Sequence, residues 1–244
     1  PVLAPKSPSD CFNMMINAFQ IAIQSMTPVI VLADADLANS AEPWLIPEVN
    51  ELPDMKAWVK NSKISQTKMH LRNKTRLAKA WIRPGTPNLQ HCLGGLEKDI
   101  YHNHISYDPE NHHEMVMLRA KKVNAIADNY APLEILGDKK SKRLIISWGS
   151  TYGAVLSAVN NYLAQNKPIA MLHLPHLFPF HPDLFDLLGQ YEEILIPELN
   201  LGQLASLIKP HCKTKVKQLN KITGTPFKIR EIVAFLSNDI DTDR

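Results

Sequence analysis

The second half of the chain alternates short apolar runs with longer amphipathic stretches, and this alternation constrains the fold more than any other feature. Residues 144–146, 169–172 and 194–196 are continuous apolar runs, as expected of strands buried on both faces of a sheet. Residues 155–163 and 201–208, which follow the first and third runs, have the apolar spacing of helices. Strands that alternate with helices favour parallel pairing through right-handed crossovers. The predicted fold class is therefore α/β, with a mostly parallel sheet and helices on both faces.

The composition is that of an ordinary globular protein. At 244 residues and 45% hydrophobic content, the chain can form one large or two small domains with a sizeable core. Its net charge of +3 gives no indication of a nucleic-acid partner, and no apolar run is long enough to span a membrane. The first residues lack a charged-then-apolar leader, so we expect no signal peptide. Three widely spaced cysteines suit a reducing cytoplasm and are too few for an iron–sulfur cluster within this chain, so we expect a cytoplasmic protein.

The first part of the chain is predicted to contain two helices and a strand. Ser9 and Asp10 are expected to cap a helix that ends near Met26, followed by a short buried strand over residues 29–32. The spacing of apolar residues predicts a second, longer helix over residues 110–130. The apolar stripe predicted for the first helix consists of Phe12, Ile16, Phe19, Ile23 and Met26.

A basic stretch lies between residues 56 and 83. It contains nine Lys or Arg residues and no Asp or Glu. Such a run is typical of a solvated surface, or of a patch that docks an acidic partner or an anionic ligand. No ladder of aromatic side chains accompanies it, which argues against nucleic-acid binding. Its role is left open between the first two interpretations.

Histidines are concentrated in the same half of the chain, where five of the ten lie between residues 91 and 113, with Cys92 adjacent. His102 and His104 could supply two metal ligands, but no spacing here matches a zinc template. We therefore predict no metal site and ordinary surface roles for these side chains. The five histidines are His91, His102, His104, His112 and His113.

Two short glycine-bearing segments, residues 148–153 and 197–204, each follow a predicted strand and open a predicted helix. Such segments lie at the carboxyl ends of parallel strands, where α/β folds bind ligands. The first resembles the hydrolase motif G-x-S-x-G, but Ser150 stands one place too early for a nucleophile. Ser150 and Thr151 are better explained as residues at the start of a helix whose hydroxyl groups accept hydrogen bonds from backbone N–H groups.

Three residues of the second segment are candidates for a site. Glu198 directly follows a strand and could be a general base, an interface ligand or a helix-terminus partner. Asn200 is expected to cap the next helix.

Asp34 and Asp36, after the first strand, suggest either magnesium binding or an ordinary loop start. We assign no catalytic, cofactor-binding or metal residue, and keep as interface or anion-contact candidates Ser150, Thr151, Glu198, Asn200 and Gln203.

These segments together resemble the α subunit of 2-oxoacid:ferredoxin oxidoreductases, most closely the 2-oxoglutarate type. Their order and separation fit the family over nearly the whole chain. One departure is His102, which stands where the family usually has glycine. The matching stretches are residues 10–47, 94–97, 106–112, 119–123, 148–153 and 197–204.

The resemblance implies an oxidative decarboxylation. In this family a thiamine diphosphate carbanion attacks a 2-oxo acid, carbon dioxide leaves, an iron–sulfur cluster passes electrons to ferredoxin, and coenzyme A takes the acyl group. Residues 1–45 then resemble the end of a pyrimidine-binding domain, residues 46–140 a connecting region with one long helix, and residues 141–238 a transketolase-C-like domain.

The resemblance also implies which chemistry this portion lacks. The activating glutamate and the substrate-contacting motif are expected upstream of Pro1, and the diphosphate, Mg and cluster on the β subunit. We therefore expect this portion to be structural or interfacial and inactive by itself. One alternative is a stand-alone transketolase-C-like binding module without redox activity; another is a different thiamine enzyme, such as a transketolase or a pyruvate dehydrogenase β chain.

Overall fold

The computed structural model describes residues 1–56, 72–91 and 93–237. The chain divides into two compact units. The first unit comprises Pro1, Ile16–Val29 and the described residues of Ile46–Tyr130, and the second comprises Val2–Met15, Ile30–Leu45 and the described residues of Ala131–Arg244. The segment boundaries predicted near residues 45 and 140 stay predictions.

The second unit is built on a sheet that has five strands among the described residues, in the order β3-β5-β4-β7-β8. β4, β5, β7 and β8 run parallel, and β3 pairs antiparallel with β5 at the edge. The predicted α/β class and mostly parallel sheet are therefore confirmed. The carboxyl ends of the parallel strands lie on one side of the sheet, which we call the carboxyl edge. The strands are β3 (Ile135–Gly137), β4 (Arg143–Ser147), β5 (Ala170–His173), β7 (Glu193–Glu198) and β8 (Lys215–Asn220).

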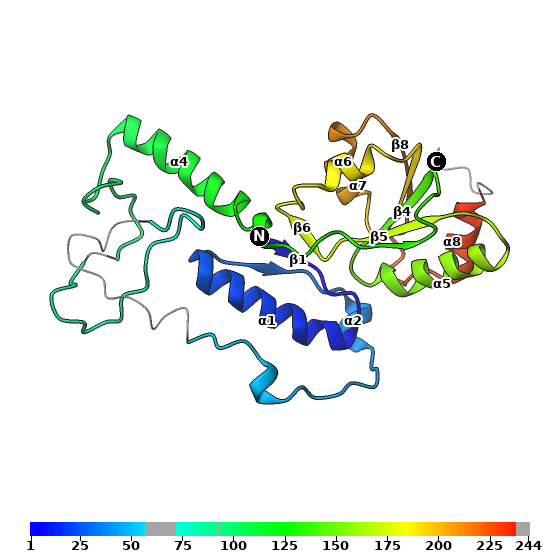
Figure 1. Cartoon of the computed structure of the whole chain (residues 1–244), viewed down its shortest axis with the longest axis horizontal. Helices are drawn as coiled ribbons and strands as arrows, with labels where there is room; N and C mark the ends of the chain where they lie inside the picture. Colours follow the sequence, from blue (N-terminus) through cyan, green and yellow to red (C-terminus); the bar gives the residue numbers. More distant parts are fainter. Residues whose placement is uncertain (57–71, 92, 238–244) are drawn as a thin grey trace. The chain divides into compact units, whose positions relative to one another are not determined.

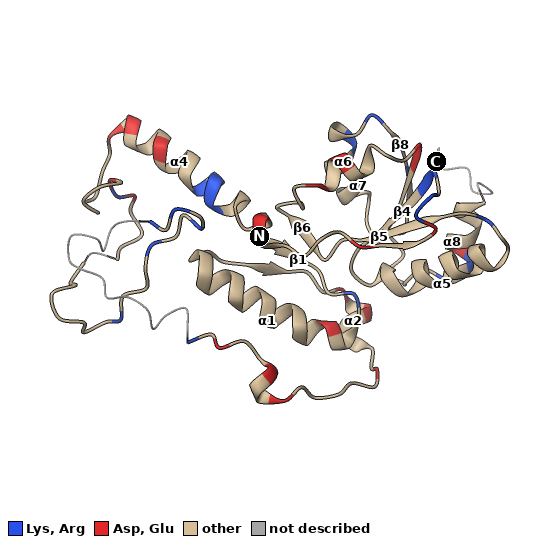
Figure 2. Cartoon of the chain, viewed as in Figure 1, with Lys and Arg blue, Asp and Glu red and all other residues tan. Residues whose placement is uncertain are grey.

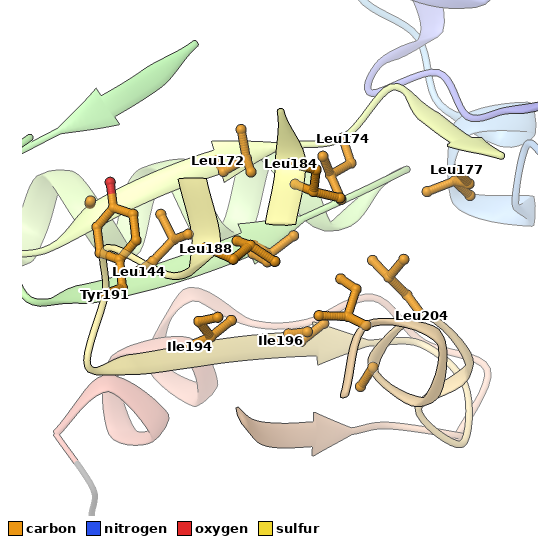
Figure 3. Packing of buried hydrophobic residues seen from close by; sticks show 14 of the residues in the cluster. Leu144, Leu172, Leu174, Leu177, Leu184, Leu188, Tyr191, Ile194, Ile196 and Leu204 are labelled. Atoms are coloured by element: carbon orange, nitrogen blue, oxygen red, sulfur yellow. The ribbon is translucent and has the colours of Figure 1, made fainter. Parts of the chain in front are cut away.

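Helices cover both faces of this sheet (Figure 1). The alternation of side chains along each strand separates two cores: Leu144 and Ile146 face one layer, whereas Ile145 faces the other. Figure 3 shows the first layer, where leucines and isoleucines of β4, β5 and β7 meet those of α6 and α7. Each fully buried aliphatic side chain contributes about 1.5–3 kcal/mol to folding. The helices are α5 (Thr151–Ala164) and α8 (Ile229–Leu236) on one face, and α6 (Leu184–Leu188) and α7 (Gln203–Ile208) on the other.

A small sheet ties the start of the chain into the second unit. Its strands are β2, β1 and β6 in that order, with β1 parallel to β2 and antiparallel to β6. The sequence did not predict β1 or β6, because strands of two or three residues are too short to have a periodic pattern. They are β1 (Val2–Leu3), β2 (Ile30–Val31) and β6 (His176–Phe178), and the short helix α2 (Ala35–Asn39) follows β2.

The first predicted helix forms as α1 (Pro8–Ser25), but two expectations about it are wrong. Ser7 caps it in place of Ser9 and Asp10: the Ser7 hydroxyl accepts the Asp10 N–H at 3.4 Å, and the Asp10 carboxylate accepts the Lys6 N–H at 2.9 Å. The predicted stripe is not the buried face, since Phe19 is 56% exposed. The helix is apolar on most sides, so its periodicity does not single out one face. The buried positions are Met14, Ala18, Ile21 and Ser25.

The first unit also contains a long helix and two short turns, while the short turn η4 (Lys209–His211) follows α7 in the second unit. The long helix predicted over residues 110–130 forms as α4 (Pro109–Asn124) followed by the short turn η3 (Ala127–Asn129), and another short turn, η1, spans Val49–Glu51. Asp108 caps α4 by accepting the Asn111 N–H at 2.7 Å, and Pro109 occupies the first position, where no N–H is needed. Within the described residues, no helix has both the length and the apolar character that crossing a bilayer requires.

Candidate functional site

The two glycine-bearing segments meet at the carboxyl edge. β4 and β7 are parallel neighbours, with Leu144 paired to Ile194, so the residues after both strands lie together. The indole Nε1 of Trp148, from the first segment, donates to Oε1 of Glu198, from the second, at 3.3 Å. Residues fifty positions apart in the sequence are therefore joined directly.

Glu198 is completely buried, and its carboxylate is fully used. Besides the indole, Oε1 accepts the Leu204 N–H at 2.9 Å and the Asn200 amide at 3.2 Å, and Oε2 accepts the Ala205 N–H at 3.0 Å. The two backbone donors are in the first turn of α7, where N–H groups have no partner inside the helix. A negative charge at this end also interacts favourably with the helix dipole. The geometry therefore makes Glu198 a buried cap that holds α7 against the sheet.

The turn between Glu198 and α7 is fixed by two further residues. Asn200 Oδ1 accepts the N–H groups of Gly202 at 2.7 Å and Gln203 at 2.9 Å, but the N-cap position of α7 that the sequence predicted for Asn200 is occupied by Gly202. Gly202 has a φ of +88°, and a Cβ at this position would lie 2.5 Å from Oε1 of Gln218. Glycine is therefore favoured here because of its backbone conformation, and a larger residue would also have to displace the flexible end of the Gln218 side chain. Gln203 remains exposed at the end of the turn.

The first segment is arranged differently from the prediction. Thr151 begins α5 as expected, and its hydroxyl accepts the Trp148 N–H at 3.2 Å and donates to the Trp148 carbonyl at 2.7 Å; these bonds close the turn before the helix and do not cap it. Ser150 makes no capping bond; its hydroxyl donates to the carboxylate of Asp34 instead. The other oxygen of Asp34 caps α2, at 3.1 Å from the N–H groups of both Asp36 and Leu37. The capping prediction for Ser150 is wrong because a carboxylate distant in sequence offers a stronger acceptor.

A serine–histidine pair at the same edge was missed by the sequence analysis. Ser147 and His173 end neighbouring strands in register, and Ser147 Oγ lies 3.0 Å from His173 Nδ1. His173 Nε2 is buried and has no hydrogen-bond partner among the described residues. The His173 ring packs edge-on against the Tyr152 ring, with 4.9 Å between the two ring centres. Lys6 Nζ lies 4.9 Å from the centre of the Tyr152 ring. Burial, and then the charge of Lys6, lower the pKa of His173 to about 4.

The imidazole of His173 is consequently neutral at physiological pH, and its unpartnered nitrogen can accept or donate one hydrogen bond. The available sequence signal was a polar residue at the end of each of two apolar strands. That signal becomes specific only when the register places the two residues side by side.

The histidine-rich region is organised by two carboxylates. Glu97 binds Arg119 at 2.9 Å and His112 at 3.0 Å. Burial alone would raise the pKa of Asp99, but N–H groups of the following loop, among them that of His104 at 2.7 Å, lower this pKa to about 2. Within residues 1–56, 72–91 and 93–237, no three His, Cys, Asp or Glu side chains converge in a way that could hold a metal ion.

The same loop accommodates the departure at His102. Asn103, the next residue, has a φ of +64° and takes the left-handed conformation that a glycine often supplies. Asparagine tolerates this conformation better than most residues do. Cys92 and residues 57–71, which include much of the basic stretch, lie outside the described residues.

Comparison with known proteins places these features in a family context. Residues 1–118 match the family described as "Pyruvate flavodoxin/ferredoxin oxidoreductase, thiamine diP-bdg". The chain is 39% identical over 239 residues to the 2-oxoglutarate oxidoreductase subunit KorA of Mycobacterium tuberculosis, covering 96% of this chain and 36% of that protein. It is 26% identical to the 2-oxoglutarate synthase subunit KorA of Archaeoglobus fulgidus, and that match covers 95% of this chain and 60% of that protein. The chain therefore spans only part of the length of these relatives.

A solved structure is similar over almost the whole chain. It is a 2-oxoglutarate:ferredoxin oxidoreductase from Magnetococcus marinus with 2-oxoglutarate, coenzyme A and succinyl-CoA bound. The TM-score is 0.82 at 26% identity, and the similarity covers 98% of this chain and 42% of that one.

The Glu198 network predicts a large effect of a nearly isosteric substitution. In Glu198→Gln, the new amide donor would face N–H groups of α7 that now bind a carboxylate oxygen, so we expect a loss of about 3 kcal/mol in the free energy of unfolding at pH 7. Urea denaturation followed by circular dichroism measures it. Glu192→Gln is the matched control: Glu192 is 72% exposed and 3.5 Å from Lys142, so its loss should stay under about 0.5 kcal/mol. Equal stability of both variants would contradict the capping role.

The environment of His173 predicts a specific pH dependence. Its pKa in the folded protein, about 4, is below the ordinary value of 6.5, so the unfolded chain takes up a proton first as the pH falls. The stability contributed by the neutral ring is present above pH 6.5 and is lost between pH 6.5 and 4. Between pH 7.5 and 4.5, the free energy of unfolding of the parent should fall by about 2 kcal/mol more than that of His173→Asn. Urea denaturation at each pH measures this difference. His102→Asn, at a side chain that is 76% exposed, is the control, and its stability should vary with pH as that of the parent does. Parallel curves of stability against pH for all three proteins would refute the role assigned to His173.

Proposed function

Because the chain belongs to the α subunits of the 2-oxoacid:ferredoxin oxidoreductase family, we propose that it forms part of the α subunit of such an enzyme. The reaction is the oxidative decarboxylation of a 2-oxo acid, 2-oxoglutarate in the first instance, to an acyl-CoA with transfer of electrons to ferredoxin. The names of the relatives support 2-oxoglutarate as the substrate, and the ligands of the Magnetococcus marinus structure support coenzyme A as the acyl acceptor.

Within that enzyme, this portion has a structural and interfacial role. The observation that carries the proposal is the state of Glu198, the one carboxylate that is buried among the described residues. Every hydrogen bond that it makes stabilises the fold, so none of its oxygens is available to move a proton. Asp34, which the sequence left open as a metal ligand, is likewise occupied by α2 and Ser150.

The cofactors are therefore proposed to be held by the remainder of the complete enzyme. A thiamine cofactor would need a buried carboxylate free to bind its pyrimidine ring, and the described residues of the 1–118 match contain no buried Asp or Glu. Thiamine diphosphate, Mg and the iron–sulfur cluster are accordingly assigned to the complete complex, and the cluster and diphosphate to the β subunit. Residues 1–45, 46–140 and 141–238 are proposed as the end of a pyrimidine-binding domain, a connecting region and a transketolase-C-like domain.

The carboxyl edge offers a surface for the partner subunit. Leu201 is 76% exposed and Gln203 is exposed, yet the turn that carries them is held rigidly by Asn200 and Gly202. An exposed apolar side chain on a fixed turn loses little entropy when it binds. We place Leu201 and Gln203 in the contact with the β subunit, and Ser150, Thr151, Glu198 and Asn200 behind them as the residues that fix the edge.

The proposal predicts activity only in the assembled enzyme. The 244-residue chain alone should not reduce a viologen dye with any 2-oxo acid and coenzyme A. The full-length α subunit, co-expressed with a β subunit that carries a thiamine diphosphate motif and cluster cysteines, should co-purify with it and reduce the dye, fastest with 2-oxoglutarate. No dye reduction by that complex with any 2-oxo acid would refute the assignment and favour a stand-alone binding module.

A pair of substitutions in the full-length subunit tests the interface. Leu201→Ser should lower the amount of β subunit that co-purifies with the α subunit, because it removes the exposed apolar side chain. Leu207→Ser is the matched control: Leu207 is 55% exposed but lies further along α7, away from the carboxyl edge, and should leave recovery unchanged. Equal recovery with both variants would remove this edge from the interface.

A further inference from the structure

The first unit contains a pocket whose charge is unusual. Its volume is about 810 Å³, which is within the range of small-molecule sites. Among the described residues that line it, five are cationic and only Glu97 is acidic. Figure 2 shows Lys and Arg on α4 and on the neighbouring loops of this unit. The cationic residues are Arg72, Lys79, Lys98, Arg119 and Lys122.

Most of these cations have neutral hydrogen-bond acceptors instead of carboxylates. Arg72 donates to the Leu77 carbonyl at 3.1 Å, and Lys122 donates to the Met26 carbonyl at 2.9 Å. Lys79 donates to the side chain of Asn103. Only Arg119, paired with Glu97, makes an ion pair among these described lining residues.

The rest of the basic stretch cannot supply the missing negative charge. Residues 56–83 contain nine Lys or Arg and no Asp or Glu. The excess positive charge in the pocket is therefore a property of the sequence as well as of the structure.

Holding these charges together is unfavourable for the empty protein. Burial, and then the neighbouring cations, lower the pKa values of Lys79, Lys122 and Arg72, and only Asp99, near Lys79, acts in the opposite direction on one of the three. Partly buried like charges without counter-charges destabilise a fold, and a bound anion removes that penalty. An arrangement of this kind is expected where a ligand supplies the opposite charge.

We propose that this pocket is a binding site for a diphosphate group. A single carboxylate carries one charge, whereas each phosphate group carries up to two and presents several acceptor oxygens to several cations. The forked guanidinium of Arg72 suits phosphate oxygens, and the lysines contribute point charges. Apolar side chains also line the pocket, among them Met26, Ile82 and Met115, so an organic portion attached to the diphosphate has a surface to pack against. The proposal does not rest on the enzymatic function proposed above.

Calorimetric titration of the full chain with inorganic diphosphate and with ADP tests the site and separates its two sources. Binding of either with one-to-one stoichiometry, weakened by added salt, is expected. Tighter binding of ADP identifies an organic diphosphate as the ligand class, and equal or tighter binding of inorganic diphosphate identifies the free anion. Absence of binding by both, or equally tight binding of succinate, would overturn the proposal.

Variants locate the binding. The double variant Lys79→Gln/Lys122→Gln removes two positive charges but keeps N–H donors for the Asn103 side chain and the Met26 carbonyl. Its affinity for diphosphate should therefore fall at least about tenfold. Without ligand, the same variant should melt at a higher temperature, because repulsion is relieved. Lys74→Gln/Arg83→Gln removes two exposed charges of the same stretch that do not line the pocket, and its affinity should stay within about twofold of the parent.

Equal losses in the two double variants would show a diffuse charge effect and overturn the pocket as the site. Should Lys79→Gln/Lys122→Gln fail to fold by circular dichroism, Lys98→Gln replaces it. The Lys98 ammonium donates to the nearby carbonyls of Gly94 at 2.8 Å and Leu96 at 2.9 Å, both outside α4, so its substitution leaves α4 intact. A loss of affinity of about threefold or more is expected. An unchanged affinity in Lys98→Gln would then count against the proposal.

Discussion

The second unit depends on one buried carboxylate. Glu198 is fully removed from water, and burying a charge is tolerated only when hydrogen bonds replace its hydration. That requirement determines its surroundings: the indole of Trp148 reaches across from the neighbouring strand, and the first N–H groups of α7 turn toward the sheet. Asn200 and Gly202 make the tight turn that allows this. The two glycine-bearing segments thus form one network that closes the carboxyl edge.

This network explains why the edge acts as a support in the proposed function. The polar groups that looked available in the sequence are used within the fold: Glu198 by α7, Thr151 by its own turn, and Ser150 by Asp34. Exposed positions remain at Leu201 and Gln203, which suits a contact with another subunit more than it suits chemistry. The first unit carries the complementary property, a pocket with excess positive charge, and the basic stretch that had no assigned role supplies Arg72 and Lys79 to it.

The sequence predicted the central sheet well because its strands are buried on both faces and therefore read as unbroken apolar runs. It also predicted the helix that follows β4, now α5, since helical spacing is a local property. Contacts between distant residues could not be predicted: Ser150 bonds to Asp34, and Ser147 meets His173 only through the register of β4 and β5. The buried face of α1 was wrong because that helix is apolar on most sides. β1 and β6 were too short to detect.

Amide hydrogen exchange at Leu204 and Ala205 tests the central role of Glu198 most directly. These N–H groups are in the first turn of α7, where amides normally exchange quickly because no helical carbonyl accepts them. If the Glu198 carboxylate holds them, they should exchange as slowly as the amides of Leu195 and Ile196 in the buried strand β7, which open only when the unit unfolds. Exchange at the rate of exposed loop amides, with β7 still protected, would contradict the account.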